Sequence, residues 1–425
     1  MKLRPLSLLL ATALVACSGT PDGAEQGEDT SDVKAATFEL FFTNPLPDLV
    51  ARGEVQQKDA EDLIATKIAG GPAPDARLVQ LIDQTKGHGC SVLLADFDFN
   101  LQSIADALVR AKARGCDVRM VTDGDTVDRA NQSADPAARY GRQKFDIDYE
   151  EPMETLLRAQ IPVHDDGARG AIMHNKFVVL NNKTVWTGSW NMSHGDLAYW
   201  NHAFVVRSPE LAQRYTKEFE YLFARFAPAH TPGGHVIDVD FVMPTEHALT
   251  IANRPFEVFF PRNDKATARV AQVVGAAKES IHFMAFQFTD GPIAAAVIER
   301  AAHGVEVKGV FENNGACSGA YSQIAAAHGD VELSRWTFGR IQGLRNFLHH
   351  KVFIIDHETV VLGSFNFSQS ADDANDENLL IVTDKDLAKS FEDEYALVAK
   401  ATKLGATPNA CKPKPVLPSV PLATP

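Results

Sequence analysis

An internal repeat is the feature of this sequence that most constrains its fold. The segment Phe38–Phe42 (FELFF) recurs as Phe256–Phe260 (FEVFF). Further along, Ile104–Gly115 is matched by Ile293–Gly304, and the interval between the copies is the same at both ends. A pattern that occurs twice indicates a duplicated folding unit, so we expect a fold built from two similar halves.

Within each copy, buried strands alternate with helices. Strand-like apolar runs, amphipathic helices and second strands follow one another in the same order. In the first copy they are Val92–Phe99, Ser103–Arg114 and Val118–Thr122, and in the second Ile281–Phe288, Ala294–His303 and Val307–Phe311. Strands that alternate with helices predict an α/β sheet with helical crossovers, here repeated twice.

The repeat also divides the chain into segments. We expect a first half at 37–226 closed by a helix at Ser208–Phe226, a linker at 227–254, a second half at 255–405 and a Pro-rich tail at 406–425. The first half has two insertions of its own, a helical stretch at Asp59–Ala69 and a polar segment at Val127–Pro152. The second insertion has four basic residues, which either overhang the functional site or form a solvated loop: Arg129, Arg139, Arg142 and Lys144.

The first residues have the pattern of an export signal. A basic start and an apolar run lead to Leu14-Val15-Ala16-Cys17, which resembles the lipobox of bacterial lipoproteins. On this interpretation residues 1–16 are a lipoprotein signal peptide, Cys17 carries the lipid, and residues 17–36 form a flexible tether. Ser18 after the cysteine favours the outer membrane of a two-membrane bacterium. The alternative is an ordinary cleaved signal peptide, and both interpretations export the protein.

Export would place the remaining four cysteines in an oxidising compartment. We expect Cys90 to pair with Cys116, because each opens a neighbouring strand, and the pairing of Cys317 with Cys411 follows by elimination. The cysteine spacings contain no CxxC, so they do not predict a zinc site. We therefore expect no metal and no cofactor.

The third matched block is the most polar part of the repeat. The first copy reads HNKFVVLN and then GSWN, from His174 to Asn191, and the second reads HHKVFIID and then GSFN, from His349 to Asn366. Residues i and i+2 of a strand share a face, so each histidine points the same way as the lysine two positions later, Lys176 or Lys351. If the halves pack about a pseudo-twofold axis, these groups converge, together with the serine and asparagine of each GSxN turn: Ser189, Asn191, Ser364 and Asn366.

Such a constellation suits a phosphodiester. Lysines and amides would hold the non-bridging oxygens as negative charge builds on them, and the serine hydroxyls could donate to the same anion. One imidazole would attack phosphorus while the other protonates the leaving oxygen, which gives a phosphohistidine that water resolves. The two ammonium groups supply the positive charge that a metal ion supplies in other phosphoryl-transfer sites.

The two blocks resemble the HxKx4Dx6GSxN signature of the phospholipase D superfamily. The resemblance implies a duplicated α/β/α sandwich whose halves are related by a pseudo-twofold axis and share one active site. The second copy matches every signature position, including Asp356, whereas the first has Asn181 in place of the aspartate. The resemblance gives that aspartate a mainly structural role.

The resemblance also assigns the roles of individual residues. It implies that His174 is the nucleophile and His349 the general acid, although the exchange of these roles stays open. Asn375-Asp376-Glu377-Asn378 resembles the family segment whose glutamate orients a catalytic histidine, and the first half has Trp200-Asn201 at that place, with no glutamate. We expect His350 to be a core group, His202 a satisfied loop histidine, and Asp165-Asp166 a solvated turn.

The substrate class stays open between three hypotheses. The preferred one is a hydrolase of the phospholipase D kind (EC 3.1.4.4-like) that removes the head group of a phospholipid, and a transferase variant needs only an alcohol in place of water. The second is a metal-independent nuclease, and the third a non-catalytic envelope lipoprotein that binds anionic lipid. A formal charge of -14 weakly disfavours a long polyanion. We expect a monomer, because duplication supplies both half-sites.

Overall fold

The computed structural model describes residues 37–44, 74–131, 150–167, 170–229, 246–312, 320–327, 329–333 and 347–402, with isolated positions at 56, 58 and 236. Several sequence predictions lie outside the described residues: the signal peptide, Cys17 and the tether, the helix at 59–69, Cys317, Cys411, most of the 127–152 segment and the Pro-rich tail. All described residues belong to one compact unit, which begins at Thr37.

Both halves contain a mixed eight-stranded sheet in which seven strands have the same order and the eighth is added at opposite edges of the two sheets. The first sheet runs β1-β7-β6-β5-β2-β3-β4-β8 and the second β13-β12-β11-β14-β15-β16-β10-β9. The first is made of β1 (Phe38–Thr43), β2 (Ser91–Asp96), β3 (Asp117–Thr122), β4 (Val163–Asp165), β5 (Lys176–Leu180), β6 (Thr184–Gly188), β7 (Asn201–Arg207) and β8 (Ala227–Pro228). The second is made of β9 (Ala248–Ile251), β10 (Arg254–Phe259), β11 (Ser280–Ala285), β12 (Glu306–Phe311), β13 (Asp330–Leu333), β14 (Lys351–Ile355), β15 (Thr359–Gly363) and β16 (Leu379–Thr383).

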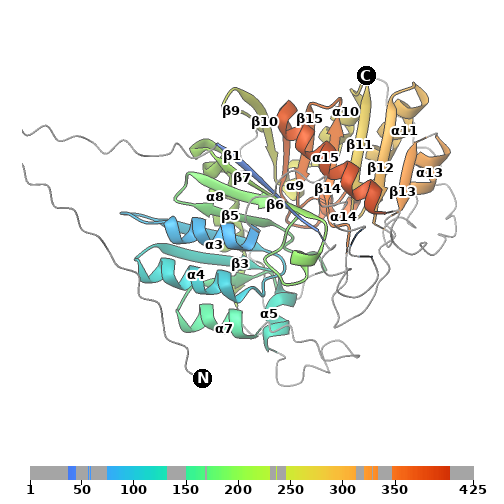
Figure 1. Ribbon diagram of the computed structural model, residues 1–425. Coiled ribbons are helices and arrows are strands. Elements are labelled where there is room, and N and C mark those ends of the chain that lie inside the picture. Colours follow the sequence, from blue (N-terminus) through green and yellow to red (C-terminus); the bar gives the residue numbers. More distant parts are fainter. Residues whose placement is uncertain are drawn as a thin grey trace, which may run out of the picture. The chain divides into compact units, whose positions relative to one another are not determined.

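Helices cover both faces of each sheet, as Figure 1 shows. The first half has α3 (Pro74–Gln84), α4 (Gln102–Ala113), α5 (Gly124–Asn131), α7 (Glu150–Arg158), a 3-10 turn at Asp196–Ala198 and α8 (Pro209–Arg225). The second has α9 (Pro261–Asp264), α10 (Ala266–Gly275), α11 (Gly291–Ala302), α13 (Ala320–Ala326), α14 (Gln369–Asp373) and α15 (Lys385–Ala401). The predicted duplicated α/β fold is confirmed, and the strand order shows that the repeat covers seven of the eight strands of each sheet, with β8 and β9 added at opposite edges.

The linker boundary at residue 254 was wrong. Residues 248–251 form β9, which pairs antiparallel with β10 and extends the second sheet, from Ala248 opposite Glu257 to Ile251 opposite Arg254. Positive φ angles at Ala252 and Asn253 make the tight turn between the two strands. The second sheet therefore begins before the residue at which the sequence repeat becomes recognisable.

The equivalent helices α8 and α15 close the two halves and begin in the same way. Ser208 accepts a hydrogen bond from the Leu211 amide ahead of α8, and Asp384 accepts hydrogen bonds from two amides at the start of α15. These caps satisfy amide groups that otherwise lack partners at a helix N-terminus. Both helices then bury one face in a single apolar cluster that also includes residues of both sheets, such as Phe177 and Val352.

That shared cluster joins the halves into one body. Phe38 and Phe256 are the equivalent first residues of the repeated segments Phe38–Phe42 and Phe256–Phe260. Their rings stack with centroids 5.7 Å apart. Two further clusters lie on the outer faces of the sheets, one in each half. No helix within the described residues is both long and apolar enough to span a bilayer.

The structure contains the expected disulfide between Cys90, just before β2, and Cys116, just before β3. The two cysteines are 26 residues apart in sequence. Both side chains are buried against the outer cluster of the first half. The bridge therefore joins the beginnings of two parallel strands that α4 connects.

We expect the double variant Cys90→Ala/Cys116→Ala to lose about 3 kcal/mol of unfolding free energy, because the bridge restricts the unfolded chain over a loop of this length. Urea unfolding followed by circular dichroism measures the loss. Wild-type protein in reducing buffer is the matched control and should be destabilised similarly. Equal stability of the oxidised wild type and the variant would contradict this account.

Candidate active site

The two motif histidines lie where the backbone of one half pairs with the backbone of the other. Met173 pairs in an isolated parallel bridge with Asp376, and Leu348 does so with Trp200. The backbone amide of His174 donates to the Asp376 carbonyl (2.8 Å), and that of His349 donates to the Trp200 carbonyl (2.9 Å). The histidines are thus held by backbone bonds between segments that are about 150 to 200 residues apart in sequence.

His174 is held by a carboxylate from the second half. Its Nδ1 lies 2.8 Å from both carboxylate oxygens of Glu377, and the Ser364 hydroxyl donates to the same carboxylate at 2.5 Å. All three residues are buried. Because the carboxylate accepts the Nδ1 proton, the Nε2 lone pair of His174 is available to a reacting group.

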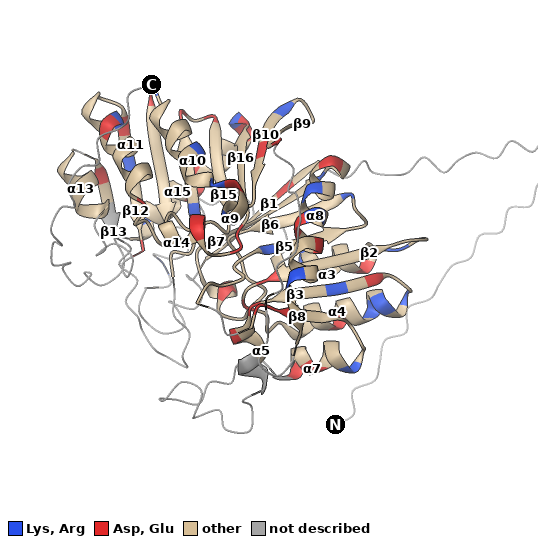
Figure 2. Cartoon of the chain, turned by 180° about the vertical axis from the view of Figure 1, so that it is seen from behind, with Lys and Arg blue, Asp and Glu red and all other residues tan. Residues whose placement is uncertain are grey.

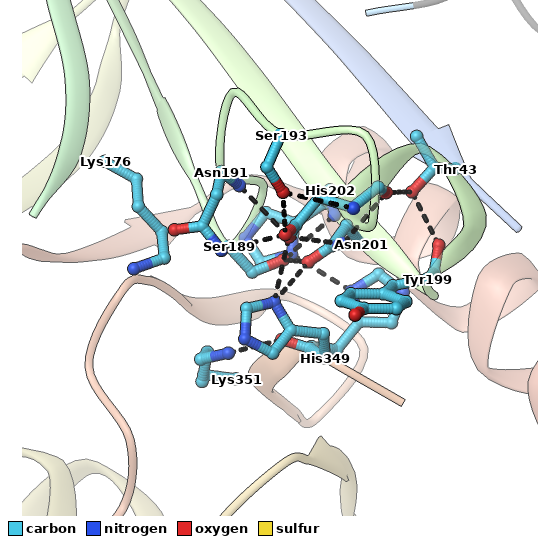
Figure 3. Close-up of polar contacts among 12 residues, drawn as sticks. Thr43, Lys176, Ser189, Asn191, Ser193, Tyr199, Asn201, His202, His349 and Lys351 are labelled. Carbon is cyan, nitrogen blue, oxygen red and sulfur yellow. Dashed lines mark hydrogen bonds and ion pairs between the residues drawn. The ribbon is translucent and has the colours of Figure 1, made fainter. Parts of the chain in front are cut away.

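His349 is held in the equivalent way by an amide from the first half. Its Nδ1 lies 2.8 Å from Oδ1 of Asn201, to which the Ser189 hydroxyl also donates (2.9 Å), as Figure 3 shows. Asn201 therefore occupies the place of Glu377 in the other copy, but it is neutral. The sequence comparison identified this difference without showing what replaces the missing charge.

The missing carboxylate is supplied by Asp196, which the sequence analysis did not identify. Asp196 is buried, and its Oδ1 lies 3.3 Å from Nδ1 of His349. It accepts hydrogen bonds from the Asn201 amide (3.0 Å), the Asn191 backbone and side-chain amides (3.1 and 3.0 Å) and the Ser193 hydroxyl (2.9 Å). Burial raises the pKa of Asp196, whereas the bonds from Asn191 and Ser193 favour its charged form.

The two motif lysines are arranged with the same symmetry. Nζ of Lys176 donates to the His174 carbonyl (2.8 Å) and Nζ of Lys351 to the His349 carbonyl (2.6 Å). Each ammonium lies over an aromatic ring, Lys176 over Phe97 (5.1 Å) and Lys351 over Phe286 (4.8 Å). Burial lowers the pKa of both lysines, and the charge of Lys176 lowers the pKa of Lys351 further.

Burial and the lysine charges also act on the histidines. The pKa of His174 and that of His349 lie well below the usual value, first because both rings are buried and then because the ammonium groups repel a further proton. Burial raises the pKa of Glu377, whereas the charge of Lys176 and the hydrogen bond from Ser364 favour its carboxylate form. Burial and the lysine charges thus favour the neutral form of both imidazoles.

The backbone geometry of each GSxN turn requires its glycine. Gly188 and Gly363 have positive φ angles, and a Cβ there would meet the backbone carbonyl of His202 at 2.3 Å or of Asn378 at 2.4 Å. Only glycine allows this approach. In this structure the hydroxyls of Ser189 and Ser364 donate to the groups that hold the histidines, and their donation to a substrate anion stays a prediction.

The two motif asparagines are both buried but have different partners. The side-chain amide of Asn191 donates to Asp196. Asn366 is 6% exposed, and its Oδ1 has no hydrogen-bond partner among the described residues. The two asparagines therefore differ, because the first half has Asp196 where the second half has Ala371.

Asp356 does not belong to the reacting groups, although it is part of the signature. It lies in the turn after β14 with a positive φ angle and accepts hydrogen bonds from the amides of Lys278, Glu279 and Ser280 (2.8 to 3.0 Å). Asn181 has the equivalent position and accepts one bond, from the Ser91 amide (3.2 Å). The replacement of aspartate by asparagine in the first copy therefore alters the attachment of a strand, not the chemistry.

Other buried polar groups correct the sequence expectations. Asp165 and Asp166 are buried rather than solvated, and Asp166 accepts the Met173 amide beside His174 (2.9 Å). His202 and His350 are buried, with their Nδ1 atoms 3.0 Å apart. His350 is thus a core group as expected, whereas His202 contacts Ser189 behind the site rather than lying in a loop.

Comparison with known proteins agrees with this geometry. The family described as "Cardiolipin synthase, PLD-like domain" matches residues 78–223 and 270–397, which together exceed half of the chain. A solved structure of phosphatidylserine synthase from Haemophilus influenzae Rd KW20 aligns over 76% of this chain and 83% of its own, with a TM-score of 0.53 and 14% identity, and so shows a similar fold.

Curated relatives match a shorter part of the chain. A phospholipase D of Rickettsia bellii is 34% identical over 125 residues, which is 29% of this chain and 59% of the relative. A mitochondrial cardiolipin hydrolase of Xenopus tropicalis is 29% identical over 135 residues, 32% of this chain and 61% of the relative. The alignments therefore span about 60% of these relatives' length. The family match over both halves, each with its own histidine and lysine, shows that the chain belongs to the phospholipase D-like superfamily.

Proposed function

We propose that this protein is a metal-independent phosphodiesterase that hydrolyses the head-group phosphodiester of a phospholipid and leaves phosphatidic acid. The observation that carries the proposal is the pair of buried histidines, each held at Nδ1 by a group from the other half and each followed by a lysine. This arrangement presents two imidazole Nε2 atoms and two ammonium groups to one phosphodiester.

His174 is the nucleophile in this mechanism. The Glu377 carboxylate stabilises the positive charge that the ring gains when Nε2 bonds to phosphorus. The P–O bond to the leaving alcohol breaks, and His349 donates its Nε2 proton to that oxygen. The products of this step are a phosphohistidine and a free alcohol.

Water completes the reaction. His349, now neutral, takes a proton from a water molecule whose oxygen attacks phosphorus, and the P–N bond breaks to restore His174. Asp196 stabilises the protonated state that His349 enters and leaves. The net reaction consumes one water and converts a phosphodiester into a phosphomonoester and an alcohol.

The unusual pKa values fit this division of labour. A neutral His174 is ready to attack, because burial and the lysines keep its pKa low. His349 must first gain a proton, and the negative charge of a bound phosphodiester favours that proton by offsetting Lys176 and Lys351. We infer that substrate binding raises the pKa of His349 and so allows it to hold the proton that it later donates.

A lipid substrate is supported by the predicted location and the charge distribution. A lipid on Cys17 would hold the protein at the cell envelope, at the periplasmic or outer face of the outer membrane. Figure 2 shows acidic and basic residues interspersed on helices such as α4 and α8. The names of the relatives include phospholipase D and cardiolipin hydrolase.

A nuclease activity at the same site is the second candidate. Four half-buried rings surround the histidines: Phe97, Phe286, Tyr199 and Phe347. Such rings can stack on the bases of a single strand as well as contact apolar lipid groups.

The first prediction from the proposed function concerns the nucleophile. With bis-p-nitrophenyl phosphate, whose leaving group needs no acid, we expect His349→Ala to release one p-nitrophenolate per chain and then stop, because water is no longer activated. Mass spectrometry should find a base-stable, acid-labile phosphoryl adduct on His174. We expect His174→Ala to show neither burst nor adduct, and both variants to lose about 10³-fold or more in steady-state turnover.

Circular dichroism and melting curves check that both variants are folded. An adduct on His349 in the His174→Ala variant would reverse the two roles. Turnover at the wild-type rate in either variant would refute the two-histidine mechanism.

The second prediction concerns Asp196. We expect Asp196→Asn to lower kcat about 10²-fold and to move the falling, high-pH limb of the rate profile to lower pH. The reason for the sign is that His349 acts as an acid, and the loss of a neighbouring carboxylate lowers its pKa. Asp373→Asn, an exposed carboxylate paired with Lys265, is the control and should behave as wild type. An unshifted profile in Asp196→Asn would mean that Asp196 only supports the fold.

The third prediction separates the substrate classes. EDTA-treated protein is assayed side by side on phospholipid vesicles, single-stranded DNA and RNA. We expect release of head group with accumulation of phosphatidic acid, and the His174→Ala variant gives the background. Cleavage of nucleic acid alone would favour the nuclease, whereas a folded protein with no turnover on any substrate would favour a lipid-binding lipoprotein.

A further inference from the structure

We propose that His282, His357 and Glu392 form a binding site for one divalent metal ion of the zinc class, separate from the motif histidines. The three residues come from different elements of the second half: His282 from β11, His357 from the turn after β14, and Glu392 from α15. One ligand atom of each lies within 4.8 Å of the others.

The cluster lies at the far end of the sheet from the active site. β14 begins next to His349 at Lys351, which pairs with Ala285, and ends at Ile355, which pairs with Ile281. His357 follows that end, and His282 lies next to Ile281 on β11. β14 spans Lys351–Ile355, which corresponds to about 13 Å of extended strand, and His357 lies in the turn beyond it. A metal ion here would not contact the reacting groups.

The carboxylate of Glu392 lies between the two imidazole rings. Nδ1 of His282 is 2.6 Å from Oε2, and Nδ1 of His357 is 2.9 Å from Oε1. Both rings thus turn the same nitrogen toward one carboxylate, so their potential ligand atoms converge.

The opposite nitrogen of each ring also has a partner. Nε2 of His282 lies 3.0 Å from a Glu306 carboxylate oxygen, and Nε2 of His357 lies 3.2 Å from the Ser280 hydroxyl. A partner at Nε2 orients each ring, which is the way outer partners orient histidine ligands of metals. Each Nδ1 hydrogen-bonds to Glu392 in this structure, and a metal ion would displace the Nδ1 proton and bind both groups.

The ligand set favours zinc over the hard cations. Two imidazole nitrogens and one carboxylate suit Zn²⁺, whereas Mg²⁺ and Ca²⁺ prefer oxygen ligands. The His282 ring stacks on Tyr395 (5.1 Å between centroids). His357 has 53% of its side chain exposed, so the ion can enter from solvent and water can complete the coordination.

A metal ion in this place would tie α15 to the sheet. The three proposed ligands, His282, His357 and Glu392, are far apart in sequence, so no motif with a fixed spacing of ligands predicts them. The absence of a CxxC motif says nothing about a site of this kind. An ion that binds only the folded chain stabilises it by mass action. We infer a stabilising role, with the phosphodiester chemistry independent of the ion.

The test uses the full chain, stripped with EDTA and dialysed, then titrated with Co²⁺ followed by Zn²⁺. We expect one Co²⁺ per chain with visible absorption bands of a low-symmetry site, displacement by Zn²⁺, and a higher melting temperature in Zn²⁺. In His357→Ala we expect at least tenfold weaker binding and no melting shift. The exposed His357 side chain makes loss of the fold an unimportant risk, and circular dichroism checks it.

His303→Ala is the matched control, because His303 is also an exposed histidine that lies beside a glutamate, Glu299. It should bind Co²⁺ as wild type does, and Glu392→Gln should weaken binding as His357→Ala does. Equal binding in wild type and His357→Ala, or no binding at all, would overturn the proposal and leave an ion-pair cluster. Binding is measured without any substrate, so its outcome is independent of the proposed hydrolase activity.

Discussion

The hydrogen bonds between each motif histidine and a buried acceptor from the opposite half are the interactions on which the site depends. His174 meets Glu377, and His349 meets Asn201. Neither half can present a correctly oriented imidazole alone, because separation would remove the acceptor that each Nδ1 atom meets, Glu377 for His174 and Asn201 for His349. The apolar cluster shared by α8 and α15 holds the halves at the spacing that these bonds require.

Duplication produced a symmetric scaffold with an asymmetric charge distribution. Glu377 places a carboxylate directly at Nδ1 of His174, whereas His349 faces a neutral amide with the Asp196 carboxylate 3.3 Å away. A directly paired carboxylate stabilises a ring that is cationic for as long as it is bonded to phosphorus. A more distant one leaves the other ring free to gain and lose a proton. The difference between the halves therefore matches the difference between a nucleophile and a proton carrier.

Self-comparison of the sequence predicted what the repeat contains twice, the family resemblance added Glu377, and Asp196, which occurs once, was missed. The strands, crossover helices, histidines and lysines have counterparts in both halves, so self-comparison found them. Asp196 has no counterpart, because Ala371 stands at the equivalent place, and so no pattern marked it. The bond from Ser189 to Asn201 was also missed, because pairing of β6 with β7 brings the two residues together. Contacts between strands are not visible in the spacing of residues.

The two lysines explain why the net charge of the chain says little about the site. Lys176 and Lys351 are both 1% exposed. The charge of Lys176 lowers the pKa of Lys351, and the charges of both lysines lower the pKa of His174. Carboxylates nearby, those of Glu377, Asp96 and Asp196, offset part of this repulsion. A phosphodiester anion between the lysines would remove much of the rest and would favour a proton on His349. The unfavourable electrostatics of the free site therefore become a source of selectivity for an anionic substrate, whatever the charge of the surrounding surface.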